Sequence, residues 1–88
     1  MRIIRRRYSL AVLNVVRSCG VARFHDVELA LPAASTSTLA ETMRALVDVQ
    51  LLTREGTGES VPRSVYRLTP SGAKLLERLR RLLDDVSP

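Results

Sequence analysis

Two short stretches of the sequence bring hydroxyl and guanidinium groups together, and both kinds of group bind phosphate oxygens. A guanidinium can also bind guanine through its planar fork, a hydroxyl can bond to either type of base edge, and a carboxylate can accept from the amino group of cytosine. The candidates in the first stretch are Ser35, Thr36, Ser37, Thr38, Glu41, Thr42 and Arg44. Those around the second are Arg54 and Arg63, and Arg23 and His25 lie upstream of both stretches.

Each candidate also has a purely structural interpretation. The four hydroxyls are typical helix N-caps, and Glu41 can close a capping box with Thr38. The arginines of the second stretch can pair with Glu55 and Glu59 across two strands, a surface contact worth about 0–1 kcal/mol. A lone histidine such as His25 is usually an ordinary surface or partly buried residue.

Apolar spacing predicts the elements that carry these residues. Residues 8–18 form a first helix, which Gly20 ends, and 24–31 form a second, which ends before Pro32. Residues 36–49 form a third helix on which the hydroxyls and Arg44 face solvent, as do Glu41 and Thr42. Strands at 51–55 and 64–69 enclose a turn-rich tip, and 21–23 can add a third strand. Thr69 and Pro70 open a last, leucine-rich helix.

Basic residues are concentrated at the N-terminus. The net charge is +5, and residues 1–7 hold four arginines and no acidic residue, whereas 8–69 hold six arginines and six acidic residues. We therefore predict a basic arm at 1–7, a domain at 8–70 and a C-terminal helix at 71–88. The arm, with Arg5, Arg6 and Arg7, has three open roles: it lies along a nucleic acid, packs in a dimer through Ile3 and Ile4, or stays disordered.

The last helix carries more leucine than a single chain of 88 residues needs for its core. A domain of this size is marginal when alone, and a second copy would bury more apolar surface. One side of the helix can pack on the domain while the other forms half of a dimer contact. The predicted homodimer contact consists of Leu75, Leu79, Leu82, Leu83 and Val86.

Composition excludes several classes of protein. The chain has one cysteine and one histidine, no glycine-rich phosphate loop and no nucleophile with an evident base, so we expect no enzyme, no cofactor and no metal site. The sequence contains no run of 18 apolar residues, so it predicts no membrane span. The single cysteine favours a reducing, cytoplasmic setting. We expect Cys19 to be a small buried hydrophobic residue rather than an oxidant sensor.

The segments RFHDVELAL, STSTLAETMRALVDVQLLTRE and PRSVYRLTPSGAKLL resemble the small winged helix-turn-helix regulators of the HxlR, PadR and MarR type, HxlR above all. The resemblance rests on Ser35 four residues before Leu39, and on Tyr66, Leu68, Thr69 and Gly72, which run from the second strand of the hairpin into the last helix. It implies a mainly helical α+β fold with three helices, a two- or three-stranded β-hairpin wing and a C-terminal dimerisation helix. Gln50 stands where the family generally has glycine, so we expect that turn to be made differently.

The resemblance implies a transcriptional regulator that binds double-stranded DNA as a homodimer. Its recognition helix, at about 36–49, would enter the major groove, and its wing, at 55–64, would touch the flanking backbone or minor groove. The alternative is a winged helix that binds another protein and no DNA, which the charge neutrality of residues 8–69 favours. A small-molecule effector would have to bind at the dimer interface, but the sequence names no residues for it.

Overall fold

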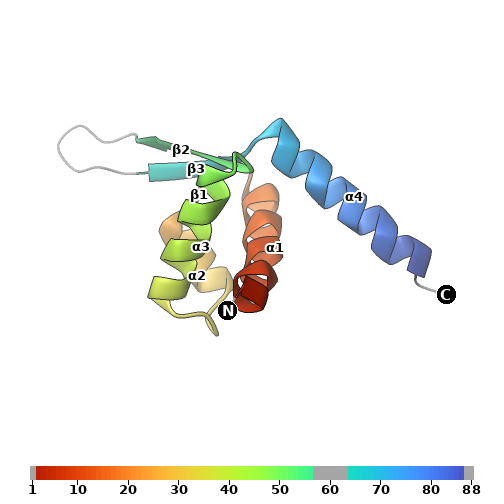
Figure 1. The fold of residues 1–88 in the computed structure, drawn as a ribbon. Helices are drawn as coiled ribbons and strands as arrows, with labels where there is room; N and C mark the ends of the chain where they lie inside the picture. Colours follow the sequence, from red (N-terminus) through yellow and green to blue (C-terminus); the bar gives the residue numbers. More distant parts are fainter. Residues whose placement is uncertain (1, 57–63, 87–88) are drawn as a thin grey trace.

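Four helices and a small sheet make up the computed structural model, which describes residues 2–56 and 64–86, with side chains for 8–56 and 64–84 (Figure 1). The helices are α1 (Arg2–Cys19), α2 (Phe24–Ala30), α3 (Thr36–Asp48) and α4 (Pro70–Val86). The strands β1 (Ala22–Arg23), β2 (Leu52–Gly56) and β3 (Ser64–Leu68) form an antiparallel sheet in the order β1-β3-β2. The predicted mainly helical α+β class is confirmed, as is the third strand.

The core lies between α1 and α3, which lie side by side beneath the sheet (Figure 1). Its buried side chains come from every described element except β3, whose Tyr66 and Leu68 are partly buried against it, and the two largest contributions are the stripes on α1 and α3 that the apolar spacing predicts. They are Val12, Leu13, Val16, Ala22, Val27, Leu39, Met43, Leu46, Leu52 and Leu76. Because one face of α3 packs into this core, its opposite face is exposed to solvent.

The first helix is longer than the sequence suggested. It begins at Arg2, so the predicted start at residue 8 is wrong and residues 2–7 continue the helical backbone. Arginine is a good helix former, and neither proline nor glycine interrupts the segment. The end of α1 and the bounds of α2 and α3 agree with prediction to within one residue, and α4 begins at Pro70 as predicted. The predicted end of the last helix at residue 88 lies outside the described residues. The division into arm, domain and C-terminal helix stays a prediction.

The turn after α3 keeps a left-handed residue although glycine is absent. Gln50 has a φ of 64°, its N–H donates to the Val47 carbonyl (3.0 Å), and the N–H of Leu51 donates to the Leu46 carbonyl (2.9 Å). These two bonds form a Schellman motif with Gln50 in the position that glycine usually takes. The expectation of a different turn is therefore wrong: the two bonds and the burial of the adjacent strand hold Gln50 in this conformation.

The same turn anchors the start of α4. The Thr69 hydroxyl accepts the Gly72 N–H (3.0 Å) and donates to the Gln50 carbonyl (2.6 Å), and the Thr69 N–H donates to the Leu51 carbonyl (3.2 Å). A Cβ atom at position 72 would overlap the Leu51 carbonyl oxygen. The Thr-Pro-x-Gly motif therefore joins the turn after α3 to the turn that leads from β3 into α4. From this junction α4 extends away from the sheet and contacts α1 (Figure 1).

Candidate nucleic-acid interface

The N-terminus of α3 is held by its own hydroxyl groups. Ser35 is the N-cap, its Oγ accepting the Thr38 N–H (3.1 Å) and donating to the Thr38 Oγ1 (2.9 Å). Thr36 Oγ1 donates to a carboxylate oxygen of Glu28 in α2 (2.9 Å), which ties the two helices together. Ser37 is exposed. The capping interpretation is thus correct for Ser35, whose partner is Thr38, while Ser37 presents its hydroxyl outward.

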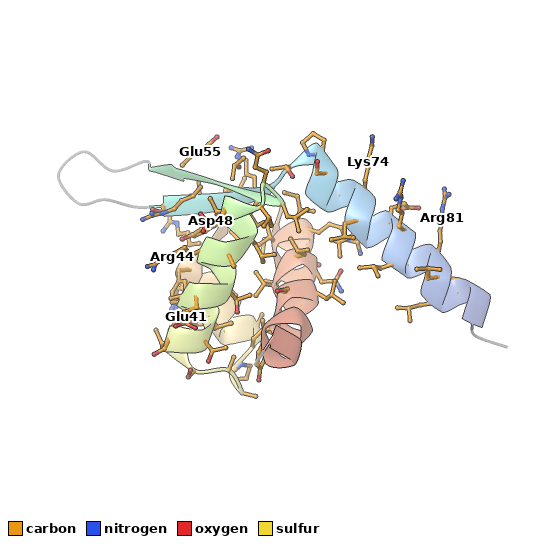
Figure 2. All side chains as sticks on the ribbon, in the orientation of Figure 1. Glu41, Arg44, Asp48, Glu55, Lys74 and Arg81 are labelled. Atoms are coloured by element: carbon orange, nitrogen blue, oxygen red, sulfur yellow. The ribbon has the colours of Figure 1, made fainter. Side chains whose placement is uncertain are left out.

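Thr42 does not face solvent, so its assignment to the outer face of α3 is wrong. Its side chain is 1% exposed, and its Oγ1 donates to the Thr38 carbonyl (2.7 Å). A threonine can be buried in this way because the carbonyl four residues earlier satisfies its hydroxyl. Glu41 and Arg44 are exposed as predicted, and Asp48 joins them. Figure 2 shows these three on the side of α3 away from α1.

The register of the hairpin sorts its charges onto two faces. Leu52 pairs with Leu68 and Arg54 with Tyr66, so these four side chains share the face that covers the core. Glu55 lies on the other face, where its carboxylate is 3.7 Å from the Arg67 guanidinium. Arg54 instead donates from Nε to the Ser64 Oγ (3.0 Å). Arg54 therefore projects on the α3 side of the wing, while Glu55 points away from α3 (Figure 2).

Arg44 and Arg54 meet at a hollow of about 280 Å³ between α3 and the sheet. Its lining is Phe24, Ala40, Arg44, Val47, Asp48, Arg54 and Tyr66. Sequence reasoning did not propose Asp48 or Tyr66 for the site. The four-residue spacing from Arg44 to Asp48 was a signal for the first, but only the strand register brings Tyr66 beside Arg54.

The remaining predicted contacts lie elsewhere or outside the described side chains. Arg23 pairs with Val65, which puts it on the outer face of the sheet, and its N–H donates to Asp26 Oδ2 (2.9 Å). His25 is exposed, with Nδ1 3.8 Å from a Glu28 carboxylate oxygen. The wing tip, with Arg63, lies outside the described residues, as do the side chains of Arg5, Arg6 and Arg7.

Exposed leucines line a second region, between α1 and α4. Leu82 and Leu83 are 59% and 67% exposed, whereas Leu75 and Leu79 are half-buried and the Val86 side chain lies outside the described residues. A groove of about 410 Å³ lies beside them. It is lined by Leu10, Asn14, Arg17, Leu76, Leu79, Arg80 and Leu83.

Cys19 is exposed, which makes the expected buried role wrong: it lies at the last turn of α1, beyond the stripe that packs into the core. Among the described residues, no cluster of histidine, cysteine or acidic side chains has the arrangement that holds a metal ion. The described helices also include none with the length and hydropathy needed to cross a membrane.

An exposed third helix beside a two-stranded wing defines a winged helix-turn-helix, the fold of DNA-binding transcriptional regulators. The sequence model of the HxlR-like helix-turn-helix family matches residues 3–87, so the chain belongs to that family. With the structural likenesses below, this membership makes the chain a DNA-binding transcriptional regulator.

Solved structures share this fold. A PadR-like transcription factor from Bacteroides fragilis has a TM-score of 0.86 and 19% identity, covering 97% of this chain and 87% of its own. A MarR-family transcriptional regulator from Enterococcus faecalis has a TM-score of 0.79 and 28% identity, covering 85% of this chain and 67% of its own. PadR of Bacillus subtilis, solved in complex with operator DNA, has a TM-score of 0.73 and 21% identity, covering 82% of this chain and 45% of its own. A search of curated proteins found no match.

Proposed function

We propose that this regulator binds double-stranded DNA sequence-specifically as a homodimer, with α3 in the major groove and the wing on the flanking backbone or minor groove. The observation that carries this proposal is the division of α3 into a buried face and an exposed polar face beside the wing. Ser37, Glu41 and Arg44 lie on that exposed face and would meet base edges or phosphates. PadR, a protein of similar fold, was solved in complex with operator DNA, and this supports the proposal that the fold binds DNA.

The proposed dimer contact is the exposed part of α4. Leu82 and Leu83 project away from the domain, and the apolar groove between α1 and α4 continues the same surface. Adjoining exposed leucines of this kind mark an interaction surface. A two-fold dimer would present two copies of α3 to half-sites about one helical turn apart, which implies a pseudo-palindromic operator.

The basic N-terminal segment would add phosphate contacts or join the dimer contact. Arg5, Arg6 and Arg7 supply positive charge that residues 8–69 lack in net terms. Charge of this kind contributes affinity without sequence information, and salt screens it strongly. We further propose that the protein acts in the cytoplasm, associated with DNA, and that a small-molecule effector would bind near the dimer contact.

The test is fluorescence anisotropy with the DNA upstream of the protein's own gene and with a scrambled duplex of equal length. We expect tighter binding to the upstream DNA, with affinity falling steeply as salt rises. Replacing Arg5, Arg6 and Arg7 with glutamine should flatten the salt dependence while preserving discrimination between the two duplexes. A folded protein that binds neither duplex at low salt would contradict the proposal and favour a protein partner.

A further inference from the structure

The hollow between α3 and the wing has the chemistry of an anion site. It combines two guanidinium groups from different elements, those of Arg44 and Arg54, with the aromatic residue Tyr66. Its lining is more polar than apolar, unlike the groove between α1 and α4. A volume of about 280 Å³ is also at the small end for a site that encloses an organic ligand. These features favour a small, charged group over an apolar molecule.

The charge balance of the hollow matches one monovalent anion. Arg44 and Arg54 supply two positive charges and Asp48 one negative charge, so a single positive charge is left over. A DNA phosphodiester carries one negative charge, and arginine binds phosphate in a bidentate geometry. A second phosphate would meet the Asp48 carboxylate without a further cation among the lining residues.

Most polar groups of the hollow are not engaged by other described residues of the protein. The Ser64 hydroxyl accepts from Arg54 Nε, which leaves the terminal nitrogens of that guanidinium to donate elsewhere. The side chains of Arg44 and Asp48 and the Tyr66 hydroxyl make no hydrogen bond or ion pair with another described residue. The competing carboxylate of Glu55 is on the opposite face of the wing, where it pairs with Arg67.

We propose that Arg44, Arg54 and Tyr66 together bind one backbone phosphate of the DNA strand that passes between α3 and the wing. This inference rests on the proposed function, and it adds Tyr66 as a contact residue and Asp48 as the group that limits the site to a single phosphate. Because one phosphate is shared, the contacts of the recognition helix and of the wing depend on each other.

The salt dependence of DNA binding tests whether the phosphate is shared. Each neutralised phosphate contributes a slope of about 0.9 to the dependence of log affinity on log salt. The double variant Arg44→Ala, Arg54→Ala should therefore lose about 0.9 of slope. Two independent phosphate contacts would lose about 1.8, and that result would overturn the proposal. We expect each single variant to weaken binding about tenfold, and the combined loss to differ from the product of the two.

Two further variants probe the other members of the site. Tyr66→Phe keeps the packed ring and removes the hydroxyl, and we expect binding to weaken about fivefold. Asp48→Asn removes the carboxylate beside the phosphate, and we expect binding to tighten about threefold. Weaker binding by Asp48→Asn, or unchanged binding by Tyr66→Phe, would place the phosphate elsewhere.

Charge-matched controls separate the site from a general loss of positive charge. Arg67→Ala removes a guanidinium from the outer face of the same hairpin, and Arg81→Ala removes one from α4, where it lies 3.6 Å from Glu77. Both should change affinity less than about twofold, because neither guanidinium lines the hollow and each has a nearby carboxylate partner. If the unaltered protein bound no duplex, the proposed function itself would fail. If it bound DNA and the controls matched Arg54→Ala, only the shared site would fail.

Discussion

Gly72 is the residue at which the packing of the backbone leaves no room for a side chain. A Cβ atom there would overlap the Leu51 carbonyl oxygen, which already accepts the Thr69 N–H. We expect Gly72→Ala to lower the free energy of unfolding by about 1–3 kcal/mol, measured by urea denaturation. Gly56→Ala is the control, because a Cβ atom at position 56 meets nothing within 4 Å. Equal stability of the two variants would contradict this account of the junction.

At Gln50 we predict the opposite effect on stability, because a residue other than glycine occupies a left-handed position. A left-handed conformation costs an L-residue about 1–2 kcal/mol, and glycine avoids this cost. The greater freedom of glycine in the unfolded chain offsets about 0.5–1 kcal/mol of that gain. Gln50→Gly should therefore stabilise the fold by about 0.5–1 kcal/mol in thermal and urea unfolding. Gln50→Ala should leave stability almost unchanged, since the exposed side chain is lost and the strain remains.

Predictability at the residue scale depended on whether the partner of a side chain is local in sequence. The cap at Ser35 and the role of Thr69 were predictable, because their partners lie three residues away. Thr42 was misassigned because its polarity suggested solvent, whereas its position three residues after Leu39 puts it on the buried face. The role of Tyr66 beside Arg54 depended on a strand pairing that no local pattern specifies.

Among the elements, α3 owes its beginning to a single cap. Ser35→Ala removes the acceptor of the Thr38 N–H, and we expect a loss of about 1 kcal/mol in stability, measured without DNA. Ser37→Ala is the matched control, because that serine is exposed and no cap bond uses its hydroxyl. Urea unfolding of both variants checks the prediction, which fails if the two substitutions cost the same.

Helix and strand positions were largely readable from the sequence, and the exceptions have physical causes. Apolar spacing located α3, which buries one face, and the two long strands, whose Leu52 and Leu68 pack on the core. The start of α1 was missed because Arg2 to Arg7 has no apolar stripe, although arginine supports a helical backbone. The turn at Gln50 was misjudged because burial of Leu52 next to it outweighs local preference.

For the molecule as a whole, the exposed leucines of α4 provide the test of the dimer. Leu83→Glu should shift the protein from dimer to monomer in sedimentation velocity, because a charge would be buried in the contact. Leu29→Glu is a close control: Leu29 is also 67% exposed but lies on α2. A monomeric wild-type protein at micromolar concentration would contradict the proposed contact.

The spatial relation between the parts was the least predictable feature. The sequence indicated an exposed α3 and a wing, but not that a hollow between them would gather Arg44 and Arg54. That arrangement follows from the junction at Gln50, Thr69 and Gly72, which joins residues about twenty positions apart. Wing contacts at Arg63 and the roles of Arg5, Arg6 and Arg7 stay predictions.

The alternation of Arg54 and Glu55 along β2 imposes an even–odd rule on mutational change in the wing. Deleting one residue between Leu52 and Arg54 would turn Arg54 to the outer face and bring Glu55 opposite Tyr66, reversing the sign of the charge that faces α3. Inserting two residues at the same place would instead preserve the alternation. Length variation within the strand should therefore be tolerated in pairs of residues. A change of one residue would replace the arginine that attracts the DNA phosphate with a glutamate that repels it.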